Sequence, residues 1–215
     1  MEIIWLGHSC FRIRGRDVTI ITDPFDRSSG YHMGKMVADV VTVSHSAPDH
    51  SNVGAVGGTP KVIDGPGEYE IAGVFITGVA TRRDQRADRA GQRNTAYIIE
   101  MEDLTVCHLG DLGHILAPEQ VEQMNSADVL MVPVGGNNTI DAVQAAEVVS
   151  QIEPRIVIPM HFKTEVTTLP LDPVSKFLRE MGIADPIPQQ KLNVTKGTLP
   201  EETTLVLLDF RRSHS

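Results

Sequence analysis

VVTVSHSAPDH, at residues 40–50, is the stretch of sequence that decides the fold. A run of apolar, mostly β-branched residues ends at Val43 and is followed at once by His45, Asp49 and His50. The end of a strand can present side chains to a cleft, and imidazole and carboxylate groups are ligands of divalent transition metals. The stretch therefore predicts a strand that delivers metal ligands at its C-terminal end.

Two later apolar runs have the same design. Leu104–Leu109 leads through Gly110 to Asp111, and Ile156–Met160 leads directly to His161. A single short motif often matches by chance, and Asp49 alone could be a turn residue. Three strand ends with ligand-type residues are harder to explain as turns. We therefore predict that one cleft collects His45, Asp49, His50, Asp111 and His161.

The remaining pattern predicts strands in the first half of the chain and alternating strands and helices in the second. The expected strands of the first half are Ile3–Leu6, Phe11–Arg14, Val18–Thr22, Val40–Ser44, Lys61–Ile63, Tyr69–Ala72, Val74–Val79, Thr95–Met101 and Leu104–Leu109. In the second half we expect strands at Val129–Val134, Ile156–Met160 and Thr204–Asp209. Helices are expected at Glu119–Met124 after Pro118, from a capping pair of Asp141 and Gln144 to Ile152, and from Asp172 to Gly182. So few helices cannot cover one large sheet, which favours two packed sheets with helices outside.

Composition narrows the class of protein. The chain has 215 residues, 41% of them hydrophobic, and a formal net charge of −9. This size suits one domain, and the acidic balance disfavours nucleic acid or an anionic membrane as partner. Two cysteines indicate a reducing compartment, and no apolar run approaches the ~20 residues of a membrane span. We expect no signal peptide and a cytoplasmic location; the oligomeric state is open, with a homo-oligomer as one option.

The chain resembles the metallo-β-lactamase superfamily. HSAPDH at 45–50 is similar to the superfamily signature His-x-His-x-Asp-His, and five other segments are similar to landmarks of one branch: WLGHSCF at 5–11, ITDPF at 21–25, GPGEY at 65–69, HLGD at 108–111 and PMH at 159–161. That branch holds small metal-dependent hydrolases related to ascorbate-6-phosphate lactonase. The resemblance implies an α/β fold, a four-layer αβ/βα sandwich, formed as a single domain by residues 1–215.

The resemblance also implies an altered metal centre. One of the family's two metal sites matches Asp49, His50, Asp111 and His161. The other site uses the position of His45 with two more histidines, and shares the bridging aspartate. Here Ala47 stands at one of those positions, and the loop at 80–84 has no histidine for the other. We expect one divalent transition metal, zinc before manganese or iron, or a cleft that has lost its metal.

Thr81–Arg93 carries five arginines in an otherwise acidic protein: Arg82, Arg83, Arg86, Arg89 and Arg93. One interpretation is a solvated surface loop. The other is that Arg83, or Arg82 if the register shifts, places a guanidinium where the first metal would lie and binds an anionic substrate. His8 and His108 are either outer supports of the metal ligands or buried core histidines.

Two functions fit these residues. The first is a metal-dependent hydrolase of a small ester, lactone or phosphoester, in which the metal activates water, Asp49 manages the proton and His45 assists. The second is a non-catalytic relative that binds or senses small anions. Loss of the first site favours the second function, and the intact second site favours the first.

Overall fold

Two large sheets form the framework of the computed structural model, which describes residues 1–83 and 93–210. The six-stranded sheet has the order β14 (Leu192–Asn193), β1 (Glu2–Gly7), β2 (Cys10–Arg14), β3 (Thr19–Thr22), β5 (Val40–Thr42) and β7 (Lys61–Ile63). The seven-stranded sheet has the order β15 (Thr204–Leu205), β13 (Ile156–Met160), β12 (Val129–Pro133), β11 (Leu104–His108), β10 (Arg93–Met101), β9 (Val74–Arg82) and β8 (Gly67–Ile71). β4 (Met36–Val37) and β6 (Val56–Gly57) pair separately.

The two sheets face each other across a common hydrophobic core. Trp5 and Phe11 of the first sheet and Ile99 of the second are almost fully buried in it. The Tyr97 hydroxyl of β10 lies at the junction and bonds to the carbonyls of Val43 and Ile63 at 2.7 and 3.1 Å. Because a buried hydroxyl needs partners, this contact fixes the second sheet against the strand ends of the first.

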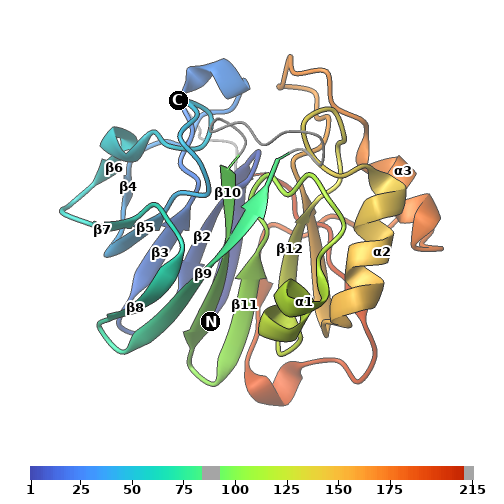
Figure 1. Cartoon of the computed structure of the whole chain (residues 1–215). Helices are drawn as coiled ribbons and strands as arrows, with labels where there is room; N and C mark the ends of the chain where they lie inside the picture. Colours follow the sequence, from blue (N-terminus) through green and yellow to red (C-terminus); the bar gives the residue numbers. More distant parts are fainter. Residues whose placement is uncertain (84–92, 211–215) are drawn as a thin grey trace.

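Helices follow the strands of the second sheet. α1 (Pro118–Met124), α2 (Ala142–Ile152) and α3 (Val174–Glu180) lie together on the β12 side of the molecule (Figure 1). α2 begins with the expected capping box, in which the Asp141 carboxylate accepts from the Gln144 backbone and the Gln144 side chain accepts from the Asp141 backbone. The mixed α/β sandwich, with sheets flanked by helices, confirms the predicted fold.

The late strand is shorter than predicted. We expected Thr204–Asp209, but β15 ends at Leu205. Val206 still donates to the Val157 carbonyl, and the chain then turns away so that Leu208 bridges to Gln189. The predicted strand thus pairs with β13 in its first part and with the segment at Gln189 in its second, and an apolar sequence pattern does not show where one pairing partner gives way to another. The short strands β4, β6 and β14 have too few residues for any pattern, and were missed.

In each large sheet, parallel pairing brings the carboxyl ends of several strands to the same edge of the sheet. β3, β5 and β7 run parallel in one sheet, and β11, β12, β13 and β15 run parallel in the other. The carboxyl ends of parallel strands meet at one edge, where ligands bind in sheets of this kind. Among the described residues, no helix is long and apolar enough to cross a membrane.

Candidate metal centre

Strand ends from both sheets supply the side chains of the centre. His8 follows β1, Asp23 follows β3, and His161 follows β13. Each of these three has a left-handed backbone, with φ of 53°, 39° and 53° respectively. Such conformations are unfavourable for non-glycine residues and concentrate at functional sites, where surrounding structure holds them. The backbone at this edge is therefore shaped to aim side chains inward.

Asp111 lies at the middle of the cluster, and its two carboxylate oxygens face different partners. Oδ1 is 3.2 Å from His50 Nε2 and 3.3 Å from His161 Nε2. Oδ2 is 3.1 Å from Arg83 Nη2 and 3.7 Å from His45 Nε2. The side chain is only 1% exposed. One oxygen thus faces the predicted metal site, and the other faces a guanidinium.

The turn before Asp111 fixes its position. Gly110 has φ of 56°, and a Cβ there would lie 2.5 Å from the Ser44 Cβ, so only glycine allows this close approach. The Asp111 backbone donates to Asn94 Oδ1 at 2.9 Å, and the Asn94 amide donates to Thr81 Oγ1 and to the Leu109 carbonyl. Hydrogen bonds through Asn94 therefore hold the loop from which the carboxylate projects.

The imidazole of His50 is oriented by a second carboxylate. Its Nδ1 donates to Asp23 Oδ2 at 2.9 Å, which leaves Nε2 directed at Asp111. Asp23 also accepts from the backbone and hydroxyl of Ser44, at 2.7 and 2.6 Å. The same hydroxyl lies 3.1 Å from His45 Nδ1. Carboxylates that orient imidazoles in this way are typical of metal centres.

Asp49 lies at the rim of the centre, on the turn built by the Ala47 carbonyl, which accepts from the His50 backbone. Its Oδ2 is 3.4 Å from His8 Nε2, and its side chain is 27% exposed. His8 itself is buried, with ring centroids 4.7 Å from His50 and 4.3 Å from His161. The structure thus brings His8 into the cluster alongside the predicted ligands.

Strong electrostatic coupling marks the centre. Burial disfavours a charged His50, but Asp111 and Asp23 raise its pKa to about 9. Burial lowers the pKa of His45 to about 4 and that of His161 to about 3. The same burial disfavours ionised Asp111, yet His50 and His161 hold the pKa of this carboxyl well below its usual range. Without metal, the centre thus holds one imidazolium between two carboxylates.

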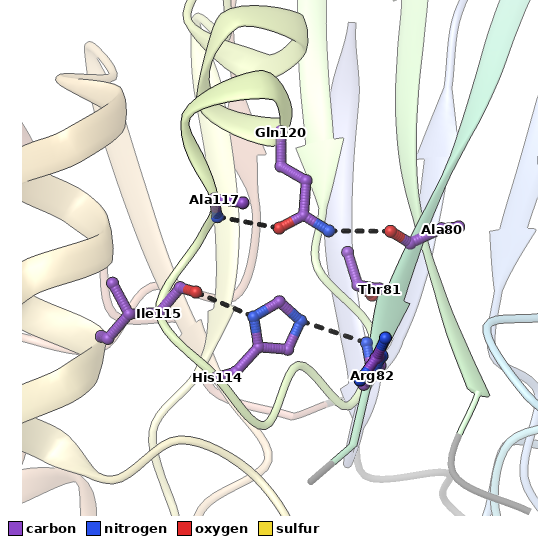
Figure 2. Close-up of a pocket in the computed structure, with 7 residues that line it drawn as sticks. All are labelled: Ala80, Thr81, Arg82, His114, Ile115, Ala117 and Gln120. Atoms are coloured by element: carbon purple, nitrogen blue, oxygen red, sulfur yellow. Dashed lines mark hydrogen bonds between the residues drawn. The ribbon is translucent and has the colours of Figure 1, made fainter. Parts of the chain in front are cut away.

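Arg83 reaches Asp111 because the end of β9 is held by the loop after β11. His114 Nδ1 donates to the Ile115 carbonyl, which leaves Nε2 to accept from the Arg82 backbone at 3.2 Å (Figure 2). The Gly113 backbone donates to the Arg82 carbonyl at 2.8 Å. A Cβ on Gly113 would lie 1.8 Å from the Arg83 carbonyl oxygen. We call these contacts the 82–114 clamp.

The predicted arginine loop is partly strand. Thr81 and Arg82 end β9 and Arg93 begins β10, paired as Arg82 with Arg93 and Thr81 with Asn94. The expectation of a loop over all of Thr81–Arg93 is therefore wrong at both ends, because the hairpin pairing continues beyond the apolar run. Arg86 and Arg89 lie outside the described residues. Arg82 has an exposed side chain, and Arg83 is the arginine that contacts Asp111.

His108 takes a different place from the predicted ligands. It is fully buried between the sheets, where Nε2 donates to the Ser9 carbonyl at 2.8 Å and Nδ1 accepts from the Gly110 backbone at 3.3 Å. It supports the glycine turn that precedes Asp111. Its contacts fit a core histidine that stabilises the site through the backbone.

The residues present fit a divalent metal. Two sets of ligand atoms lie within 4.8 Å of one another, His8 with His50 and His161, and His45 with His50 and Asp111. In the described part of the chain, Asp111 Oδ1 and His50 Nε2 have no hydrogen-bond partner although both are buried. Buried polar atoms without hydrogen bonds are rare and costly, and these two form a charge pair 3.2 Å apart that a metal could replace once His50 loses its proton. A shared cation would satisfy both.

A cleft of about 870 Å³ opens beside the Arg83 side of Asp111. It is lined by small polar and apolar residues and by five ionisable ones: His45, Asp64, Arg82, Arg83 and Arg93. Its volume suits a small molecule. The excess of arginines gives it a local positive charge in an acidic protein.

Comparison with known proteins gives the family. The beta-lactamase superfamily domain matches residues 2–161. The chain belongs to the metallo-β-lactamase superfamily. It is 30% identical to a UPF0173 protein of Pyrococcus furiosus over 187 residues, which covers 76% of this chain and 84% of the relative. A UPF0173 metal-dependent hydrolase of Thermoplasma acidophilum is 29% identical over 191 residues.

A solved structure extends the superfamily match over nearly the whole chain. A proposed Zn-dependent hydrolase of this superfamily from Thermotoga maritima has 38% sequence identity and a TM-score of 0.80, covering 98% of this chain and 99% of its own. Within this superfamily, the chain belongs to the UPF0173 family, as its similarity to the Pyrococcus furiosus and Thermoplasma acidophilum proteins shows.

Several functional side chains were missed from sequence. Ser44 and Asn94 hold the ligands through hydrogen bonds, and His114 holds the Arg83 backbone. Asn94 offered one signal, a polar residue next to an apolar strand. Asp23 was considered for the cleft but could equally have been a turn residue; the structure places it behind His50.

Proposed function

We propose that this protein is a metal-dependent hydrolase with one divalent metal, and that its substrates are small anionic esters, lactones or phosphoesters. The observation that carries the proposal is that the two carboxylate oxygens of Asp111 face different partners. Oδ1 makes no hydrogen bond and faces the Nε2 atoms of His50 and His161, whereas Oδ2 is paired with Arg83. Zinc is the first choice of metal and manganese or iron the second, given imidazole and carboxylate ligands.

The metal would be held by Asp49, His50, Asp111 and His161, with His45 nearby. A divalent metal at this place supplies a bound water of lowered pKa and a Lewis acid for the substrate oxygen. Asp49 is the proposed proton acceptor because its carboxylate lies at the rim. Contact with His8 and His50 lowers its pKa despite partial burial, which keeps the carboxylate ionised but makes it a weak base, so the lowered pKa of the bound water would have to supply most of the driving force. The aspartate needs solvent access to pass the proton on, and its partial exposure provides it.

Arg83 is proposed to replace the first metal of the family. Its guanidinium neutralises Asp111 Oδ2, which would otherwise be a buried carboxylate oxygen facing the neutral His45. Its Nε has no hydrogen-bond partner among the described residues, so it retains a donor for a ligand. Because a guanidinium binds carboxylate or phosphate through paired N–H groups, an anionic group beside the scissile bond is the expected recognition element.

Small-anion binding without catalysis is the second candidate. The Arg83–Asp111 ion pair favours it, because a guanidinium neutralises Asp111 without a metal. Under this alternative, inorganic phosphate would bind in the cleft at the same affinity with and without zinc. Under the first proposal, zinc strengthens binding and permits turnover.

The test compares chelator-stripped and zinc-reconstituted protein. 4-Nitrophenyl acetate, δ-valerolactone and 4-nitrophenyl phosphate sample the three ester classes, and Asp111→Asn serves as the variant without the bridging carboxylate. Zinc-dependent turnover of at least one class, lost in Asp111→Asn, supports the hydrolase. Zinc-independent phosphate binding with no turnover, or failure to bind zinc, favours the anion-binding protein.

Wider properties follow as part of the same proposal. One core shared by both sheets supports a single domain over 1–215. The cysteines Cys10 and Cys107 are free and buried, which suits a reducing, cytoplasmic environment. Neither nucleic acid nor membrane is proposed as a partner, given the acidic charge. The relation to ascorbate-6-phosphate lactonase and the choice of zinc stay predictions.

A further inference from the structure

We infer that His8 is a direct ligand of the metal in the place given above to Asp49, so that His8, His50 and His161 bind the ion together with Asp111, and Asp49 at the rim contacts His8. The inference rests on the proposed function for the presence of a metal, and goes beyond it in assigning a ligand outside the residues that match the family's two metal sites. His8 lies in the turn between β1 and β2, far in sequence from every other ligand.

The first support is the state of the His8 ring. The residue is 1% exposed, and neither Nδ1 nor Nε2 has a hydrogen-bond partner among the described residues. The structural alternative is a core histidine, and His108 shows what that looks like here. Both of its ring nitrogens are paired, with Ser9 and Gly110. His8 Nε2 has only a 3.4 Å contact with Asp49 Oδ2, and a buried imidazole without a well-formed hydrogen bond at either nitrogen leaves room for a metal as its partner.

The second support is the distance between candidate ligand atoms. Two ligands of a tetrahedral zinc ion, each about 2.0–2.1 Å from it, lie roughly 3.3–3.4 Å apart. Asp111 Oδ1 is 3.2 and 3.3 Å from the Nε2 atoms of His50 and His161. Both distances have the length of an edge of one coordination polyhedron. The three histidine ligand atoms fall within 4.8 Å of one another, so small inward shifts bring them to one ion.

The third support is the backbone that carries the ring. His8 and His161 share the same left-handed φ of 53°, and the His161 backbone donates to the His8 carbonyl at 3.1 Å. The Trp5 indole donates to that same carbonyl at 2.9 Å. The two unfavourable conformations are thus joined, and their rings lie side by side with centroids 4.3 Å apart. Strain shared by two neighbouring histidines is accounted for if both must reach one ion.

Direct coordination can be observed by NMR. Protein labelled with ¹⁵N-histidine is loaded with ¹¹³Cd²⁺ as a probe for zinc, and each coordinating imidazole nitrogen then shows scalar coupling to the metal. We expect coupling at one nitrogen each of His8, His50 and His161. In His8→Gln one coupled signal should vanish, and zinc affinity should fall by at least the ~10-fold typical of losing an outer-shell partner. His32→Gln, at an exposed histidine, is the matched control and should change neither.

The outcomes separate the two proposals. Metal-coupled signals from His50 and His161 with an uncoupled His8 overturn this inference alone, and leave His8 as an outer support of Asp49. Failure to bind ¹¹³Cd²⁺ or zinc overturns the proposed function. If His8→Gln does not fold, the wild-type spectrum still decides, because the His8 ring can be assigned through its neighbour Tyr31, 6.5 Å away between centroids.

Discussion

At the scale of single residues, the centre is defined by what Ala47 and Arg83 do together. Position 47 is an alanine, and the Arg83 guanidinium lies 3.1 Å from Asp111, where the proposed function has it replace a metal. The sequence predicted this pair, because the family motif showed which ligands were missing and the arginines lay where one of them belonged. It could not predict which arginine, since that depends on how far β9 continues.

Restoring two imidazoles should restore a second metal. The double variant Ala47→His, Arg83→His removes the guanidinium that competes with a metal for Asp111 Oδ2. It also adds two imidazoles as ligands beside His45. We expect zinc content to rise toward two equivalents per chain by plasma emission spectrometry. Ala47→His alone should not achieve this, because Arg83 still occupies the place. An unchanged stoichiometry in the double variant would show that Arg83 does not stand in for a metal.

Metal binding should release a proton near neutral pH. Asp111 and Asp23 raise the pKa of His50 to about 9, so the metal-free centre is protonated at pH 7, and the metal requires the neutral imidazole. The apparent zinc affinity should therefore rise about tenfold per pH unit from pH 7 to 9, and level off above. Isothermal titration in buffers of different ionisation enthalpy counts the protons. Affinity that is flat over this range would contradict the proton on His50.

At the scale of elements, strand ends decide the function. The strands themselves were predicted well, because apolar and β-branched runs have a clear period, and the capping pair at α2 was visible as Asp141 and Gln144. Contacts between loops were not predicted. The 82–114 clamp joins residues far apart in sequence through backbone groups, and backbone hydrogen bonds leave little trace in side-chain pattern.

The clamp gives a prediction for Gly113. Gly113→Ala would put a Cβ 1.8 Å from the Arg83 carbonyl, so the end of β9 must move and carry the guanidinium away from Asp111. We expect a loss of about 1–3 kcal/mol in the free energy of unfolding and weaker phosphate binding. Gly197→Ala is the control, since nothing lies within 4 Å of the added Cβ. Chemical denaturation measures the free energy of unfolding, and phosphate titration measures the affinity for the anion. Equal stability of the two variants would argue against the clamp.

At the scale of the whole molecule, two sheets meet so that β1, β3 and β5 from one and β11 and β13 from the other end around one cluster of side chains, with Asp111 at its middle. The layer order was predictable from strands followed by alternating strands and helices. The side-chain geometry at the meeting edge was not, because it depends on how the sheets pack. His8 is an example. The sequence allowed it to be a core histidine or an outer support of the metal ligands, and only the packing of the two sheets places its ring beside His50 and His161.

The central claim is one metal per chain, with Asp111 shared between that metal and Arg83. Zinc content of the wild-type protein, saturated with zinc, desalted and analysed by plasma emission spectrometry against its measured concentration, tests this most directly. The proposed function predicts one equivalent per chain, reduced strongly in Asp111→Asn. Two equivalents of zinc per chain would mean that a second ion displaces Arg83 from Asp111 Oδ2. Zero equivalents would mean that the cleft works without metal, and either result would contradict the claim.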